Sequence, residues 1–447
     1  MSLMPEDPIL RRIADFVTAK RAQTLPTGQI EALTIRLIDA IACAAMARPE
    51  PDSRTLIDSF ISPASPNAAS LIGGGIASVD DAVFCNSFLI RKADWNDTYI
   101  GRNGGHPSDF IGGVLSAGEH AGKSGLDILR AIGIGTHVML DFCDAANSLS
   151  RGWDPATYVG LAATVAMGCV LDLDEVEIAN ALAMTAVSRN MLLARTGRVS
   201  TWKNLASASA VRDCLFHVRM AQRGLSGPDP AFSGEFGFEK NISGPLALEL
   251  DPARDRSGDS HLKFYPAIYH AQGPLESCIA LHSEIAGRNI EDVCVDIYDF
   301  AIRYTADNPA KWTPHNIETA DHSLPFLVAH ALLRGEFGPG SLHATLHDEQ
   351  VRALAQRVRV NADTNFSARW PDATPSRVRV TANGLTHERI IEHIIGHPMR
   401  PLSYDDVRAK FMTCAAPMAG VARAQDWCDA LEHFAEKPSI LGLLTPA

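Results

Sequence analysis

The strongest constraint on the fold is a change of hydrophobic periodicity partway along the chain, which has 447 residues. Up to about Asp251, apolar residues recur at intervals of three and four, the spacing that places them on one face of an α-helix. Beyond that point, short runs alternate between apolar and polar residues, as half-buried strands do. A helical pattern returns from 403 to 431. The pattern predicts a large helical domain, a smaller α+β unit, and a helical tail that packs back on the first domain.

The same patterns locate individual elements. In the first part we expect helices at 30–45, 78–89, 126–140, 161–171 and 175–188. In the second part we expect strands at 293–304, 357–360 and 377–381, with helices at 320–334 and 348–354 between them. The predicted fold class is mainly α, with a helical domain over 1–264 that is completed by 397–447, and an α+β domain over 265–396.

Composition narrows the class of protein. The formal net charge is -12, and no dense Lys/Arg block occurs, which argues against a nucleic-acid surface but not against an anionic small-molecule substrate. The first residues lack a basic start followed by an apolar run, so we expect no signal peptide. The longest apolar stretches are too short to span a bilayer. We therefore predict a cytoplasmic protein with no membrane or nucleic-acid partner.

Cysteine and histidine spacing argues against a metal centre. The nine cysteines are scattered, with no C-x-x-C pair, so neither a disulfide framework nor an iron–sulfur or zinc site is expected, and most should be small core residues. Two histidine pairs are four apart, His343 with His347 and His393 with His397. Neither has a nearby carboxylate in a recognised metal motif.

The segment from Lys92 to Gly113 concentrates ionisable side chains directly before an apolar helix. Pro107 suits the first helical position, which places His106 at the N-cap. The helix dipole disfavours an imidazolium there, and a neutral imidazole can act as a general base. Free N–H groups at the same helix end can hold a carboxylate. Asp94 and Asp97 fit either a carboxylate pair for acid–base work or loop acids that cap a turn.

Two further cations fall at expected helix starts. Ser200 or Thr201 can cap a buried helix of small residues, which puts Lys203 in its first turn, where a cation is unfavourable unless it contacts an anion. Pro266 can open another helix, with His270 about one turn later, beside the expected domain boundary.

Each of these residues is, taken alone, more often structural than functional, and the sequence does not show that the three helix starts meet in space. Asp321-His322-Ser323 spells a catalytic triad in text only, because adjacent residues cannot adopt triad geometry with one another.

Several short segments, together with their order and spacing, make the chain resemble the MmgE/PrpD family. That family includes 2-methylcitrate dehydratases, cis-aconitate decarboxylases and an iminodisuccinate epimerase. The matching segments are Asp94-Trp-Asn-Asp-Thr98, Gly104-Gly-His-Pro-Ser-Asp109, Gly152-Trp-Asp154, Trp202-Lys203, Gly224-Leu-Ser-Gly-Pro228, Tyr265-Pro-Ala-Ile-Tyr-His-Ala-Gln272, Ala320-Asp-His-Ser323, Gly396-His-Pro398, Pro401-Leu-Ser403 and Lys410-Phe411.

The resemblance implies a large all-helical domain built from both ends of the chain, with a smaller α+β lid inserted and the active site between them. It implies a homodimer that needs no metal or organic cofactor and that acts on a small polycarboxylate, as in propionate catabolism. The expected catalytic residues are Asp94, His106, Lys203 and His270. The expected substrate-binding residues are Asp97, Thr98, Asp154, Tyr269 and His322.

Two positions depart from the family pattern. Many relatives have His at or beside Asp154, which Pro155 follows here, and many have Tyr at the position of Phe326. The Gly-Gly-His-Pro-Ser-Asp and His-Ala-Gln forms look more like the dehydratase branch than the decarboxylase or epimerase branches.

The expected activity is therefore a cofactor-independent hydro-lyase that dehydrates a 2-methylcitrate-like acid. Lys203 and helix N-termini would hold the substrate carboxylates and stabilise enolate-like charge. One of His106 and His270 would act as base, and the other, or Asp94, as acid. A cis-aconitate-type decarboxylase and a dicarboxylate epimerase need similar parts and stay open as alternatives. So does a non-catalytic small-acid binding protein.

Overall fold

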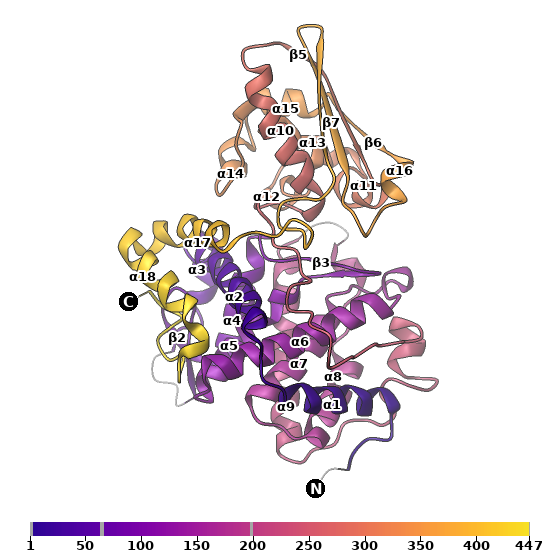
Figure 1. Ribbon diagram of the computed structural model, residues 1–447, viewed down its shortest axis with the longest axis vertical. Helices are drawn as coiled ribbons and strands as arrows, with labels where there is room; N and C mark the ends of the chain where they lie inside the picture. Colours follow the sequence, from indigo (N-terminus) through magenta and orange to yellow (C-terminus); the bar gives the residue numbers. More distant parts are fainter. Residues whose placement is uncertain (1–2, 63–66, 197–199, 447) are drawn as a thin grey trace. The chain divides into compact units, whose positions relative to one another are not determined.

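The computed structural model describes residues 3–62, 67–196 and 200–446. The chain divides into two compact units. The first, here called the helical unit, comprises Met1–Ser260 and Ser403–Ala447. The second, the inserted unit, is the continuous segment His261–Leu402. Figure 1 shows the helical unit in indigo, magenta and yellow, because both ends of the chain contribute to it.

Helices are the main elements of the helical unit, as expected for a mainly α fold. Two short hairpins, β1–β2 and β3–β4, were not predicted. The elements are α1 (Pro8–Arg21), α2 (Thr27–Ala47), α3 (Pro51–Asp58), β1 (Ala68–Ser70), β2 (Ile76–Ser78), α4 (Val79–Lys92), β3 (Tyr99–Ile100), β4 (Gly104–Gly105), α5 (Ile111–His120), α6 (Gly125–Ala145), α7 (Thr157–Val170), α8 (Glu175–Ser188), α9 (Trp202–Gln222), α17 (Tyr404–Ala419) and α18 (Val421–Glu432).

Helix α7 is the centre of the helical unit. Its sequence TYVGLAATVAMGCV is apolar all round, so the helix is stable only when it is surrounded by other helices. It packs against α6, α8 and α9, and its alanines and glycines allow close approach. Late in the chain, α17 packs against α2, so the C-terminal tail forms part of this unit.

The inserted unit is an α+β unit with one four-stranded sheet of order β6-β5-β7-β8. Strand β5 pairs parallel with β6, and the other pairs are antiparallel. Burial alternates residue by residue along β7, the pattern of a strand with one covered face. The elements are α10 (Gln272–Ile285), β5 (Ile290–Ile297), α11 (Asp299–Thr305), α12 (Ile317–Ala320), α13 (Leu324–Arg334), α14 (Ser341–Thr345), α15 (Glu349–Ala355), β6 (Val358–Ala362), α16 (Thr364–Ser367), β7 (Ser376–Ala382) and β8 (Leu385–Ile391).

The predicted strand at 293–304 is wrong in its second half. Strand β5 ends at Ile297, and α11 begins at Asp299. The buried residues of α11 are Ala301 and Thr305, which lie four apart, the spacing of one helix face. The residues around them alternate between apolar and polar, so the same segment also fits a strand. Strand β8 was missed because it is an edge strand with mostly exposed residues, so it carries little hydrophobic signal.

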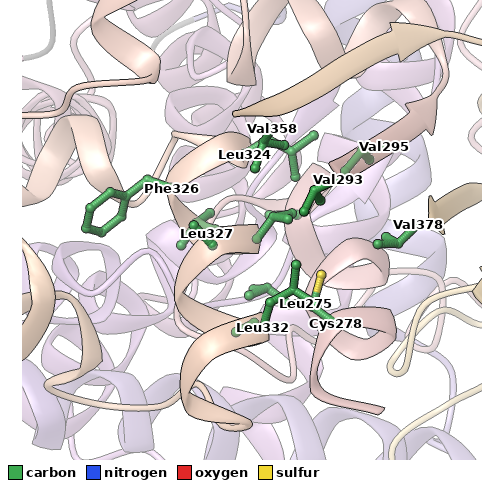
Figure 2. Packing of buried hydrophobic residues seen from close by; sticks show 14 of the residues in the cluster. Leu275, Cys278, Val293, Val295, Leu324, Phe326, Leu327, Leu332, Val358 and Val378 are labelled. Atoms are coloured by element: carbon green, nitrogen blue, oxygen red, sulfur yellow. The ribbon is translucent and has the colours of Figure 1, made fainter. Parts of the chain in front are cut away.

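The core of the inserted unit lies between the sheet and helices α10 and α13. Figure 2 shows Leu275 of α10 and Leu327 of α13 near Val293 of β5. Phe326 is fully buried in the same apolar cluster. Its ring is directed away from the strand valines.

The cysteines have the character expected of core residues. All nine are free thiols, and all but the half-buried Cys169 are buried. Burial raises the pKa of Cys85 to about 12 and that of Cys214 to about 12, so these thiols stay protonated. Over the described residues, no helix combines the length and apolarity that a bilayer crossing requires.

Candidate functional site

The carboxylate of Asp94 is held between two cations in the helical unit. Helix α4 ends at Lys92, and Asp94 follows with φ +48°, a left-handed conformation that few residues other than glycine adopt. Its Oδ1 accepts a hydrogen bond from Arg91 at 2.6 Å, and its Oδ2 lies 3.4 Å from Lys203 Nζ. Asp94 is 3% exposed and Lys203 6%. A buried pair of this kind is favourable only where each charge is compensated, which these contacts achieve.

Lys203 lies where the sequence placed it, in the first turn of α9. The anion that a cation at this helix end requires is Asp94. The predicted side-chain cap is wrong, because Thr201 at the N-cap is itself helical and makes no capping hydrogen bond. The carbonyl of Ser200 accepts from the Lys203 backbone N–H at 3.0 Å instead.

His106 occupies the predicted N-cap position, before a short 3₁₀ turn over Pro107–Phe110 that leads into α5. Its Nδ1 lies 2.7 Å from the carbonyl oxygen of Asp97 and 3.3 Å from Thr98 Oγ1. A carbonyl can only accept, so Nδ1 must carry the proton for this contact to be a hydrogen bond. In a neutral His106, Nε2 is then the nitrogen that can accept a proton, which is the form that a general base needs.

The other polar side chains of this loop hold its shape. Asp97 Oδ1 accepts from the Ser108 backbone N–H at 2.9 Å, which is the capping role rather than that of one member of a carboxylate pair. Asn96 donates to Ser108 Oγ at 2.8 Å and to Asp109 Oδ1 at 2.9 Å. Arg91 Nε lies 3.8 Å from the same Asp109 oxygen. Arg91 therefore links the Asp94 turn to the turn that carries His106.

Close packing of α5 on α4 fixes these two turns relative to each other. A Cβ on Gly112 of α5 would lie 2.4 Å from the carbonyl carbon of Asn86 in α4. That distance is far below normal van der Waals contact, so only glycine allows this approach.

Asp154 has a local structural role at the start of α7. Its Oδ1 accepts from the Ala156 backbone N–H at 2.8 Å, and its own N–H donates to the Met191 carbonyl at 2.8 Å. These contacts shape the turn before α7.

Two buried groups next to the Asp94 turn were not assigned a role from the sequence. Lys410 of α17 donates to Asp39 of α2 at 2.6 Å and to the backbone carbonyl of Trp95 at 2.8 Å. Its ammonium also lies 4.6 Å from the centre of the Trp95 ring. Burial opposes the charge on Lys410, but Asp39 outweighs it and the pKa of Lys410 is raised, so a cation is fixed beside the turn.

His270 is the centre of a second cluster, in the inserted unit. It lies in a 3₁₀ turn over Tyr269–Ala271 that runs directly into α10. The prediction that Pro266 opens this helix is wrong, because the N-cap of the turn is Ile268. Burial lowers the pKa of His270 to about 3, and His322 and Lys263 add to the shift. His270 is therefore a neutral imidazole at ordinary pH.

Tyr269 and His322, the remaining predicted residues of the inserted unit, are each hydrogen-bonded to a residue other than His270. Tyr269 OH lies 2.6 Å from Nδ1 of His261. His322 Nδ1 is hydrogen-bonded to the carboxylate of Asp321, so two adjacent residues do pair.

No triad forms at Asp321-His322-Ser323, as predicted. Ser323 caps α13 by accepting from the Phe326 N–H at 3.1 Å, which gives its hydroxyl a structural role.

Lys263 is a buried cation to which the sequence assigned no role. It is 1% exposed and lies close enough to His270 to affect its pKa. Gln272 holds the turn that follows it, because its Oε1 accepts from the backbone N–H groups of Phe264 at 3.1 Å and Tyr265 at 2.9 Å. The signal that could have found Lys263 is its place in the sequence, directly before the family segment that runs from Tyr265 to Gln272.

Each of the two clusters, taken by itself, has the chemistry of an anion site. The helical unit offers Arg91 and Lys203, and the inserted unit offers Lys263 and neutral His270. Both oxygens of Asp94 are occupied by cations, so its carboxylate suits the positioning of Lys203 better than it suits a metal ion.

Comparisons with known proteins cover most of the chain. The MmgE/PrpD N-terminal domain matches residues 11–251, and the MmgE/PrpD C-terminal domain matches residues 265–433. The 2-methylcitrate dehydratase of Escherichia coli K12 is 27% identical over 413 residues, which is 81% of each chain. That of Cupriavidus necator is 26% identical over 436 residues, covering 88% of this chain and 87% of the relative. The cis-aconitate decarboxylase of Mus musculus is 24% identical over 372 residues, covering 75% and 72%.

Proposed function

Because the chain belongs to the MmgE/PrpD family, we propose that it is a hydro-lyase that removes water from a 2-methylcitrate-like hydroxy polycarboxylate by acid–base catalysis, without a metal or organic cofactor. The observation that carries the proposal is the set of buried Arg91, Asp94 and Lys203 together with half-buried His106. Arg91 and Lys203 flank the Asp94 carboxylate, and the backbone carbonyl of Asp97 orients His106. Relatives named as 2-methylcitrate dehydratases align over most of both chains, which supports the reaction class.

In the proposed reaction His106 acts as the base. Its Nε2 takes the proton from a carbon beside a substrate carboxylate, the C–H electrons form the C=C bond, and the C–O bond breaks. The hydroxyl leaves as water after it receives a proton, for which protonated His106 and the Lys203 ammonium are the donors that the contacts favour. Asp94 is held by two cations, which fits positioning Lys203 better than donating a proton.

Cations stabilise the intermediate charge. Removing a proton beside a carboxylate builds enolate-like charge, and preorganised donors in a water-poor site lower its energy strongly. Arg91 fixes Asp94, Asp94 fixes Lys203, and Lys203 would then meet the substrate carboxylate. We propose that His270 and Lys263 of the inserted unit act on the same substrate.

The cis-aconitate decarboxylase of Mus musculus supports a second candidate, loss of CO₂ from an unsaturated tricarboxylate. That reaction also passes through an anionic state, so the same cations would serve it. A dicarboxylate epimerase and a non-catalytic acid-binding protein complete the set of candidate functions, and a single experiment separates all four.

The test is a proton NMR time course in D₂O with purified protein, chelator and a panel of acids: 2-methylcitrate, citrate, cis-aconitate and tartrate-like compounds. We expect vinylic signals from 2-methylcitrate. Itaconate signals would identify a decarboxylase, and deuterium incorporation without net conversion an epimerase. Ligand-induced shifts without turnover would identify a binding protein.

Lys203→Ala should lower turnover at least a hundredfold, because the developing charge loses its nearest cation. The matched control is Lys123→Ala, which removes a partly exposed lysine paired with Asp172 at the surface. If both variants retain wild-type rates, the role of Lys203 is wrong. If chelator abolishes turnover, the cofactor-independent mechanism is wrong.

We also propose a homodimer in the cytoplasm, which rests on the family resemblance. Light scattering after size-exclusion chromatography tests the dimer directly: a mass near the 48.2 kDa of one chain would contradict it.

A further inference from the structure

His270 is enclosed by aromatic rings within the inserted unit. The ring centroids of Tyr298, Phe300 and Trp370 lie 5.6, 5.7 and 5.5 Å from that of His270, and Tyr304 stacks on it at 6.0 Å. Trp370 in turn stacks on Tyr298, with centroids 4.3 Å apart and planes within 14°. The orientation of the imidazole is therefore fixed by packing, independent of any substrate.

One polar contact crosses this enclosure. Tyr298 OH lies 2.7 Å from His270 Nδ1. Tyr298 is 1% exposed, and burial raises its pKa well above that of a free phenol, with Tyr269 adding to the shift, so the hydroxyl keeps its proton. Across the described part of the chain, neither Tyr298 OH nor His270 Nε2 has another hydrogen-bond partner.

The position of the two protons follows from this geometry. If Tyr298 donates to Nδ1, then Nδ1 is the acceptor and the single proton of the neutral imidazole is on Nε2. In the reverse arrangement, Nδ1–H would donate to the phenol oxygen and the phenol O–H would be buried without an acceptor. Each arrangement leaves one donor without a protein partner: Nε2–H of His270, which is 8% exposed, in the first, and the O–H of Tyr298, which is 1% exposed, in the second. An unpaired donor costs most where water cannot reach it, so the first arrangement is favoured.

We propose that Tyr298 is a positioning residue that keeps the proton of His270 on Nε2 and so makes this histidine a neutral hydrogen-bond donor. His270 then stabilises negative charge that builds on the substrate, while His106, with its proton on Nδ1, is the base. The two histidines hold opposite tautomers because one contacts a donor and the other a carbonyl. This catalytic role of His270 rests on the proposed function, whereas the tautomer itself does not.

Nitrogen NMR of full-length protein labelled with ¹⁵N-histidine tests the tautomer without any substrate. The His270 signals are assigned as those lost in His270→Gln. We expect wild-type His270 to show a proton bonded to Nε2 and an unprotonated Nδ1. In Tyr298→Phe, which keeps the ring against Trp370, we expect the proton to distribute over both nitrogens. Tyr158→Phe is the matched control, since Tyr158 is a fully buried tyrosine of the helical unit, and it should leave the His270 signals unchanged.

Turnover provides the second readout. Tyr298→Phe should lower kcat roughly fivefold to tenfold, the factor that loss of one hydrogen bond represents, with KM nearly unchanged and thermal unfolding within a few degrees of wild type. A proton on Nδ1 in the wild-type protein would overturn the proposal, and this measurement needs no variant. If the proton stays on Nε2 in Tyr298→Phe, Tyr298 is not the residue that fixes the tautomer of His270. If no acid is turned over but the tautomer is as stated, the proposed function fails and the positioning role stands.

Discussion

At the scale of single residues, each titratable side chain of the two clusters is oriented by one defined contact. His106 has a carbonyl, His270 has a phenol, and Lys203 has a carboxylate. The partners of His270 and Lys203 lie far from them in the sequence. Asp97 is the exception, because it lies nine residues before His106. For His270, folding also lowers the proton affinity, which makes stability depend on pH.

His270 gives the clearest pH prediction. Its pKa is about 3 in the folded chain against an ordinary value of 6.5, so between these pH values the unfolded chain binds more protons. The free energy of unfolding therefore rises with pH through this window; the contribution is complete above about 6.5 and is lost on acidification. His270→Gln should reduce the slope of unfolding free energy against pH, between pH 4 and 6, by up to about 1.4 kcal/mol per unit.

Urea titrations at several pH values measure that slope. His433→Gln, which changes an exposed histidine, is the control and should leave it as it is. An unaltered slope in His270→Gln would mean that His270 is not held neutral by the fold. His137 and His397, whose pKa values burial lowers to about 3 and about 4, contribute to the slope that remains.

At the scale of elements, the turn after α4 is supported by a helix that lies more than 300 residues later in the chain. Lys410 of α17 reaches Asp39 of α2 and the carbonyl of Trp95, next to Asp94. The strained φ of Asp94 persists because the surrounding contacts determine it. Helix α17 therefore supports the candidate site as well as closing the helical unit.

Lys410→Met should lower the free energy of unfolding by about 3–5 kcal/mol, because it leaves the Asp39 carboxylate buried and uncompensated. Asp39→Asn should cost a similar amount, whereas the double variant should cost clearly less than the sum. The double-mutant cycle is read from urea unfolding. Additive losses would show that the pair is not coupled, and the support of the Asp94 turn would need another source.

At the scale of the whole molecule, the two units differ in how the chain builds them. The inserted unit is one continuous segment with its own apolar core and sheet. The helical unit is discontinuous, because its N-terminal part needs α17 against α2. Continuity predicts which part can fold alone.

A fragment over 261–402 should fold by itself, and a fragment over 1–260 should not, since it leaves the apolar face of α2 uncovered. Circular dichroism and thermal melting of the two fragments measure this. Addition of a peptide over 403–447 to the second fragment should raise its helical signal. Cooperative melting of 1–260 alone would show that the tail adds stability without being required.

The sequence by itself determined the features that depend on residues close together along the chain. Periodicity located the expected helices, the Gly-His-Pro stretch put His106 at a helix start, and the small residues after Lys203 predicted a buried cation in need of an anion. The sequence misplaced the end of β5, because a short alternating pattern fits both a strand and a helix. It also misplaced the helix start near His270, because a proline is compatible with more than one local structure.

Only the tertiary structure decided the partners. Arg91 and Lys203 on Asp94, Lys410 on the Trp95 carbonyl, and Tyr298 on His270 join residues from different elements. Apart from Arg91 with Asp94, these pairs lie too far apart in sequence for any local pattern to connect them. Proton positions and charges follow from such contacts, because hydrogen bonds and buried ion pairs depend on distance in space and not on distance along the chain.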